Sequence, residues 1–307
     1  MRDSFALALN EISRERDDLF LITADISPAS ALIDFVKKNP KRVIDVGVSE
    51  QIMTGIAAGL AMKGFRPFTY SIANFSVFRP FEQIRVDLSY QNLPVTVIGV
   101  GAGLSYSALG GTHHSLEDIA ILSTLPNFQI LTPSDPSEVI NCVRASLEWE
   151  GPTYIRLGKS GELNLSNRYI DKFKVGFIRR LKTKHDFQAK KAILTYGPIV
   201  NWVLESLESN QAGKEVDVFT CSSIYPLPKK DIEDLLVRYE SLTIVEEHYE
   251  KNGLGSIIKN CISPKEWENK LNVIGANFDW LHVYGNQDHL RSKAGITPSR
   301  LFQTLNG

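Results

Sequence analysis

The sequence predicts an α/β protein of two domains, each a mostly parallel twisted sheet flanked by helices. In both halves of the chain, short runs rich in Val, Ile and Leu alternate with segments of helical periodicity, which is typical of parallel strands covered on both faces. The length of 307 residues is about twice that of a typical domain. With 43% apolar and 22% charged residues, the composition is that of a globular protein rather than a disordered or fibrous one.

The first domain is expected over residues 1–165. Apolar runs bounded by turn residues predict strands at 20–25, 42–47, 66–71, 93–101 and 128–134. Helical periodicity predicts helices at 31–40, 49–64, 82–91, 116–124 and 136–148. Pro40 ends the first of these helices, and Ser49 and Gly64 are the N-cap and the stop signal of the second.

After a linker expected over 166–187, a second alternation of strands and helices begins at Ala192 and predicts a second domain over 188–307. Its expected strands are AILTYG (192–197), EVDVFTCSSIYPL (215–227) and LTIVEEH (242–248). Its expected helices lie near 199–209, at 229–238 and after KNGLGS (251–256).

Charge and hydropathy exclude several classes of protein. Lys plus Arg number 34 against 35 Asp plus Glu, so no overall positive field attracts nucleic acid or an anionic membrane. The longest apolar run, 93–104, is too short to span a bilayer, and Glu11 interrupts the N-terminus too early for a signal peptide. The three cysteines (Cys142, Cys221 and Cys261) are too widely spaced for a disulfide framework or a metal cluster. We expect a cytoplasmic protein without metal ligands of its own.

Common catalytic and nucleotide-binding motifs are absent from the sequence. There is no phosphate-binding G-x-x-x-x-G-K-[ST], no H-E-x-x-H and no G-x-S-x-G. Gly101-Ala102-Gly103 follows a predicted strand but lacks the third glycine of the dinucleotide-binding fingerprint. The simplest nucleotide-binding and hydrolase functions are therefore excluded.

Three other features of the sequence carry side chains that could be catalytic or bind a ligand. Glu50 begins a helix rich in small residues, where its carboxylate could be catalytic or could simply interact with the helix dipole. Phe75, Phe78 and Phe81 are spaced three apart, either as core residues or as a pocket for a flat ring. Pro80 prevents one continuous helix through them, which places Phe75 and Phe78 in an irregular segment.

The third feature is the loop GGTHHSLED (110–118), which precedes a predicted helix. It carries His113 and His114, of which one could reach a ligand while the other packs, although histidines in surface loops are common.

Taken together and in order, these segments resemble the transketolase family. The resemblance lies in RVIDVGVSEQIMTGIAAGLAMKGFRPF, NFSVFRPFEQIR and GGTHHSLEDIAILSTLPNFQILTPSDP for its pyrimidine-binding domain. It continues in YGPIV, VDVFTCSSIYPL, TIVEEH and GLGS for its C-terminal domain. Neither the G-D-G nor the Asn pair of the family's diphosphate-binding domain occurs here. The resemblance therefore implies the small subunit of a split transketolase, with thiamine diphosphate and Mg²⁺ held mainly by an N-terminal, diphosphate-binding partner subunit, in an α2β2 assembly.

The resemblance also implies roles for residues around the cofactor. Glu50 matches the glutamate that hydrogen-bonds the pyrimidine ring nitrogen and so promotes the proton transfer that makes the thiazolium carbon nucleophilic. Phe75, Phe78 and Phe81 match the aromatic pocket around that ring. Asp25, in TADISP, matches an aspartate near the cofactor and the subunit interface.

For the substrate, His113 matches the histidine that contacts the oxygens of the donor sugar. Arg2 and Lys159 match, the second more loosely, the two arginines that bind the substrate phosphate. Leu109 stands where the family has an aspartate that reads a sugar hydroxyl, and a leucine side chain accepts no hydrogen bond. No site residue is assigned after Lys159, because the resemblance implies that the C-terminal domain mostly builds the dimer.

Two further phosphate ligands of the family are missing, since Gly101 and Ala29 stand where it has a histidine and a serine. These departures predict transfer of a two-carbon ketol unit onto or from a modified sugar that is deoxygenated, non-phosphorylated or nucleotide-linked. Two alternatives stay open: the β subunit of a 2-oxo acid dehydrogenase, which has the same two domains, and a non-catalytic partner subunit that has kept the fold.

Overall fold

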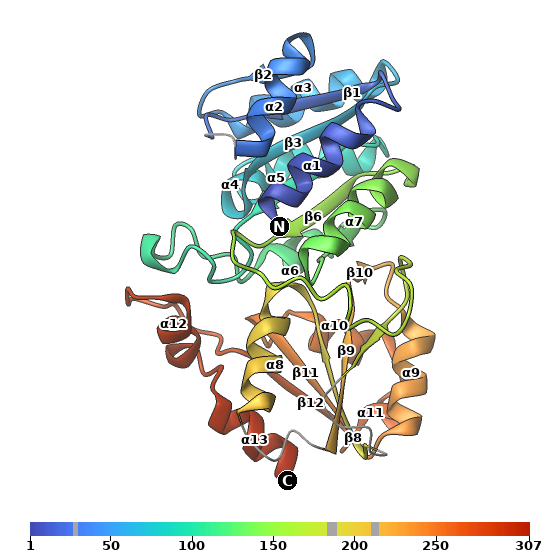
Figure 1. Ribbon diagram of the computed structural model, residues 1–307, viewed down its shortest axis with the longest axis vertical. Helices are drawn as coiled ribbons and strands as arrows, with labels where there is room; N and C mark the ends of the chain where they lie inside the picture. Colours follow the sequence, from blue (N-terminus) through green and yellow to red (C-terminus); the bar gives the residue numbers. More distant parts are fainter. Residues whose placement is uncertain (27–29, 183–188, 210–214) are drawn as a thin grey trace.

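Two separate sheets organise the chain in the computed structural model, which describes residues 1–26, 30–182, 189–209 and 215–307 (Figure 1). The first sheet is built mostly from the N-terminal half of the chain and the second from the C-terminal half, and helices flank both (Figure 1). The expected two-domain α/β fold is confirmed.

The first sheet has seven strands in the order β10-β5-β6-β4-β3-β1-β2. All run parallel except β10, which pairs antiparallel with β5 at one edge. The central strands β4 and β6 are buried at every residue, as expected of strands covered on both faces. The bounds are β1 (Leu19–Thr23), β2 (Val43–Asp45), β3 (Arg66–Ile72), β4 (Thr96–Val100), β5 (Gln129–Leu131), β6 (Thr153–Leu157) and β10 (Ser223–Tyr225).

Helices cover both faces of this sheet. Phe5 and Leu9 of α1, Phe35 of α2 and Val139 of α7 pack on one face, whereas residues of α3, η2 and α6 pack on the other. The helices are α1 (Arg2–Ile12), α2 (Ser30–Lys38), α3 (Glu50–Met62), α4 (Ala73–Val77), α5 (Phe81–Gln83), the π-helical η2 (Ile84–Tyr90), α6 (Asp118–Leu122) and α7 (Pro136–Glu148), with the short 3₁₀ turns η1 (Pro40–Arg42) and η3 (Ser107–Leu109).

The second sheet has five strands in the order β12-β11-β8-β9-β7, with β7 antiparallel at its edge. Its strands are β7 (Arg179–Leu181), β8 (Lys191–Thr195), β9 (Val216–Thr220), β11 (Ser241–Tyr249) and β12 (Leu271–Ala276). Its helices are η4 (Gly197–Ile199), α8 (Val200–Glu208), α9 (Lys229–Arg238), α10 (Leu254–Cys261), α11 (Pro264–Trp267), α12 (Gln287–Lys293) and α13 (Pro298–Asn306).

Three strands differ from the sequence-based expectation, and one of them, β12, was not expected at all. β7 lies within residues 166–187, which the sequence suggested as a linker. The segment 215–227 was expected as one strand but forms two, because β9 stays in the second sheet while β10 joins the first. The Ser222 hydroxyl, just before β10, donates a hydrogen bond to the buried Glu138 carboxylate of α7. The two domains are therefore joined by a shared strand and by buried polar contacts.

Within the described ranges, no helix has both the length and the apolar character needed to cross a membrane.

Candidate functional site

The predicted site residues lie at one edge of the first sheet. In parallel sheets, loops at the carboxyl ends of the strands meet at the same edge, where ligands usually bind. Each predicted residue after Arg2 follows such an end: Asp25 follows β1, Glu50 follows β2, Phe75, Phe78 and Phe81 follow β3, Leu109 and His113 follow β4, and Lys159 follows β6. The topology therefore places residues distant in sequence at one edge.

Glu50 is the first residue of α3 and is buried, with 4% of its side chain exposed. Its Oε1 accepts a hydrogen bond from Nη1 of Arg79 at 2.9 Å. Ser49 occupies the N-cap position as expected, but its side chain makes no capping hydrogen bond. The carboxylate is thus held by an arginine from the neighbouring segment.

Arg79 links Glu50 to an aromatic row. Its guanidinium carbon lies 3.9 Å from the centroid of the Phe75 ring, a cation–π contact. The Phe75 ring in turn meets the His113 ring edge-on, at 5.1 Å between centroids. The sequence analysis did not single out Arg79. The only indication in the sequence was its position between Phe78 and Phe81, two candidate ring-binding residues.

His113 lies on the loop that follows β4. Its Nδ1 is 2.9 Å from the Thr112 hydroxyl. Partial burial lowers the pKa of His113, and the nearby His114 and Arg79 lower it further. A neutral imidazole at this position can accept or donate a hydrogen bond to a sugar oxygen.

The other two phenylalanines are placed differently from Phe75. Phe78 and Phe81 are half-buried and pack against the core that α3 shares with the sheet. The helix is interrupted near Pro80 as expected, since α4 ends at Val77 and α5 begins at Phe81. The expectation that Phe75 lies in an irregular segment was wrong, because it lies within the short helix α4.

Tyr106 connects His113 to the predicted substrate residues. Its ring packs over Gly101, where any side chain would collide with it, and lies 6.0 Å from the His113 ring. Nζ of Lys159 lies 5.0 Å from the Tyr106 ring centroid. Burial raises the pKa of the Tyr106 hydroxyl, and the nearby Arg2 guanidinium opposes this rise. Tyr106, which was not predicted, therefore lies between His113 and Lys159, with Arg2 near enough to act on its hydroxyl.

Leu109 and Asp25 are both exposed. Leu109 ends the turn η3, with 52% of its surface exposed. Asp25 adopts a left-handed conformation with φ of +49°, and its backbone N–H donates a hydrogen bond to Oδ1 of Asp45 at 3.2 Å. The N–H of Gly47 donates to the same oxygen at 2.8 Å, so Asp45 fixes the turns that precede Glu50. Ala29 lies outside the described residues.

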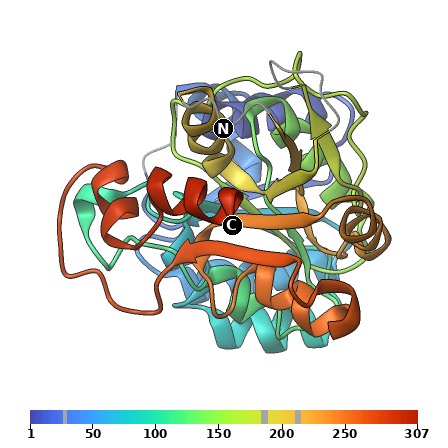
Figure 2. The same cartoon turned by 90° about the horizontal axis from the view of Figure 1, so that it is seen from below.

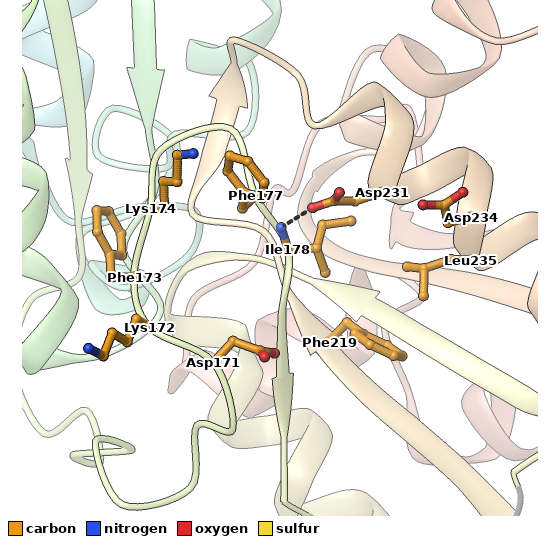
Figure 3. Close-up of a pocket in the computed structure, with 10 residues that line it drawn as sticks. All are labelled: Asp171, Lys172, Phe173, Lys174, Phe177, Ile178, Phe219, Asp231, Asp234 and Leu235. Atoms are coloured by element: carbon orange, nitrogen blue, oxygen red, sulfur yellow. Dashed lines mark hydrogen bonds between the residues drawn. The ribbon is translucent and has the colours of Figure 1, made fainter.

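A separate hollow of about 540 Å³ lies elsewhere, between residues 171–178 and helix α9 (Figure 3). Phe219 and Leu235 are among its lining residues, and Asp231 accepts a hydrogen bond from the backbone N–H of Ile178 (Figure 3). None of the predicted site residues lines it, so we do not place the site there. Across the described ranges, no three His, Cys, Asp or Glu side chains are grouped so as to hold a metal ion.

Comparison with known families identifies both parts of the chain. The family described as "Transketolase, pyrimidine binding domain" matches residues 1–161. The chain belongs to the transketolase family. A second family description, "Transketolase, C-terminal domain", matches residues 181–301, so the resemblance inferred from the sequence is confirmed.

This transketolase-family chain is similar to subunits of split transketolases. It is 31% identical to a subunit of the apulose-4-phosphate transketolase of Phocaeicola vulgatus, over 99% of this chain and 95% of the relative. It is 28% identical to a subunit of the 6-deoxy-6-sulfo-D-fructose transketolase of a Clostridium species, over 100% of this chain and 93% of the relative. A solved structure described as "Split gene transketolase, inactive beta4 tetramer" matches with a TM-score of 0.85 and 28% identity, over 99% of this chain and 96% of that one.

Proposed function

We propose that this chain is the catalytic small subunit of a two-chain transketolase that transfers a two-carbon ketol unit between sugars. The observation that carries the proposal is the contiguous row of Glu50, Arg79, Phe75 and His113 at the carboxyl edge of the first sheet. A buried carboxylate beside an aromatic face fits a flat ring with a protonatable nitrogen, as in the pyrimidine of thiamine diphosphate. A neutral histidine one ring away fits a substrate oxygen.

Each residue in this site has a separate task. Thiamine diphosphate, when bound, supplies a nucleophilic carbon for cleaving and forming the carbon–carbon bond. When the cofactor is bound, the Glu50 carboxyl group would hydrogen-bond the ring nitrogen and share a proton with it, and the burial of Glu50 would keep water from competing for that hydrogen bond. Phe75 would fix the plane of the ring, and Phe78 and Phe81, which pack against the core, would support it from behind. His113 would hydrogen-bond the oxygens of the sugar, and the exposed Asp25 would face the cofactor and the subunit interface.

The exposed apolar residues on one face of α3 indicate that a partner subunit covers this site. Val48, just before α3, and Ile52 and Met62 on it are 70%, 56% and 57% exposed. Between them, Gly55 and Gly59 have open space where a side chain would lie, so another backbone can approach closely. We propose that an N-terminal, diphosphate-binding subunit packs here, brings most of the Mg²⁺ and diphosphate ligands, and forms an α2β2 tetramer. The solved relative described as an inactive β4 tetramer agrees with a need for that partner.

The substrate residues support a modified sugar with an anionic end. Leu109 offers no hydrogen bond to a hydroxyl, and the Tyr106 ring fills the space over Gly101. Arg2 and Lys159 nevertheless supply positive charge beside Tyr106. Lys159 also lines a polar cleft of about 400 Å³ against α8 and α12, which leaves room for a substituent. Two relatives are named for an apulose phosphate and a sulfo-sugar, both of which carry an anionic group.

The free thiols of Cys142, Cys221 and Cys261 fit a reducing compartment, and we propose the cytoplasm.

Calorimetric titration of thiamine diphosphate with Mg²⁺ tests this function, first with the chain alone and then with its candidate large subunit. We expect binding only in the mixture, together with ketol transfer from a ketose donor to sugar aldehydes. Tight binding to the isolated chain, or a mixture that binds the cofactor without transfer to any aldehyde, would contradict the proposal. Ile52→Arg should prevent assembly with the large subunit. Val237→Arg, a change at an equally apolar and 81% exposed position on α9, should not.

A further inference from the structure

The loop over residues 101–117 carries Tyr106, Leu109 and His113, and it projects from the first domain on the same side as α12 of the second (Figures 1 and 2). At its base, Gly103 and Ser115 form an isolated antiparallel bridge, with the Ser115 N–H donating to the Gly103 carbonyl at 2.9 Å. The position of His113 therefore depends on what holds this two-stranded base.

One strand of the base is held by Glu247 of β11, which belongs to the other domain. Oε1 of Glu247 accepts a hydrogen bond from the Leu104 N–H at 2.6 Å, and the side chain is 6% exposed. Gly103 has φ of +58°, and a Cβ there would lie 2.5 Å from the same Oε1. Glycine at position 103 thus leaves the space that the carboxylate needs to reach the loop.

The other strand of the base is held by Arg156 of β6. Its Nη2 donates to the Ser115 carbonyl at 2.8 Å and to the Glu247 carbonyl at 3.1 Å. Its Nε donates to Oδ2 of Asp118 at 2.8 Å, and both side chains are fully buried. Both strands of the base are therefore tied to the region around Glu247.

Helix α12 fixes Glu247 in turn. Nε of Arg291 donates to its Oε2, and Nε2 of Gln287 donates to its Oε1 at 2.9 Å. Just before α12, the Tyr284 ring packs against Gly110 near the tip of the loop, where an added Cβ would lie 2.8 Å from it. The C-terminal domain therefore contacts the loop at its base and at its tip.

We propose that Glu247 is a positioning residue, which, held by Arg291 and Gln287, sets the place of His113 in the substrate site. The inference rests on the proposed function and extends it, because it gives the C-terminal domain a part in the reaction. A charge-assisted hydrogen bond between buried groups holds a backbone more firmly than a neutral contact. A small misplacement of a substrate-binding group is enough to slow the chemical step.

The test compares Glu247→Ala and Glu247→Gln with Glu246→Gln in the enzyme reconstituted with its large subunit. Glu246 is the adjacent and equally buried glutamate, but its carboxylate accepts from the Leu254 N–H and the Tyr196 hydroxyl rather than from the loop. We expect Glu247→Ala to lower kcat for ketol transfer about 10- to 100-fold with little change in cofactor affinity. Glu247→Gln should recover only part of kcat, since its amide oxygen can still accept from Leu104 while its amide nitrogen takes the place of the oxygen that accepts from Arg291.

Hydrogen exchange of the chain separates this inference from the proposed function. We expect faster exchange of the Leu104 and Ser115 amides in Glu247→Ala but not in Glu246→Gln. Unchanged exchange in Glu247→Ala would overturn the inference, as would an equal loss of kcat in Glu246→Gln. If the wild-type complex performs no ketol transfer although Glu247→Ala frees the loop, the proposed function fails and the structural role of Glu247 stands.

Discussion

Replacement of Arg79 by alanine is expected to tighten the binding of thiamine diphosphate. The guanidinium donates to Glu50 and covers the face of Phe75, so a flat ring that takes this place has to displace it. A hydrogen bond to a charged group is worth about 1.5–3 kcal/mol and a cation–π contact about 0.5–1 kcal/mol. Because 46% of the Arg79 side chain is exposed, solvent screening reduces these contributions to a net of about 1–2 kcal/mol.

The Arg79→Ala variant no longer has these contacts to displace. Its Kd for thiamine diphosphate should therefore be about 5- to 30-fold lower, since about 1.4 kcal/mol is tenfold in affinity. Calorimetric titration of thiamine diphosphate with Mg²⁺ into the reconstituted enzyme measures it. Arg85→Ala is the matched control, because Arg85 lies on the same segment but pairs with the exposed Glu82. If Arg79→Ala instead weakened binding about tenfold or more, Arg79 would be a cofactor ligand and the displacement argument would be wrong.

Three other changes have defined outcomes. Glu50→Gln should lower ketol transfer about 100-fold or more while the large subunit still binds, and a fully active variant would remove Glu50 from the mechanism. Arg156→Leu leaves Asp118 buried without its charge partner, so urea unfolding should show a loss of about 3–5 kcal/mol. A loss below about 1 kcal/mol would mean that Asp118 is protonated or solvated. Burial raises the pKa of Glu246 from 4.5 to about 7. The unfolded chain loses this proton near pH 4.5, whereas the folded protein keeps it until about pH 7. The free energy of unfolding therefore falls as the pH rises from 4.5 to about 7. The unfolding free energy of wild type relative to Glu246→Gln should fall by about 3 kcal/mol between these limits, and a constant difference would refute the assignment.

Regular elements with strong local signals were predictable from the sequence. Helices α7 (136–148) and α9 (229–238) have the predicted bounds. In α7 the reason is visible, since the Asp135 side chain caps the Glu138 N–H and Pro136 occupies the first turn. The strand β10 was not predictable as part of the first sheet, because its partner β5 lies far back in the sequence and three residues carry no alternation.

The candidate site was predictable only in part. The family motifs place Glu50, Phe75 and His113 in sequence, and the fold brings these three into one row through Arg79. Arg79 and Tyr106 carry no periodic signal, since their roles come from tertiary contacts across the strand ends. The catalytic and binding roles of these residues stay predictions until the variants are measured.

The shared strand β10 also bears on how the protein is made and dissected. As the chain leaves the ribosome, the first sheet has an open edge at β5 until residues 223–225 have been synthesised. An open edge of this kind pairs readily with another chain. A fragment that stops at residue 165 would keep that edge bare, so we expect it to self-associate rather than to behave as an independent domain. Expression and truncation studies should therefore treat the two halves as one folding unit.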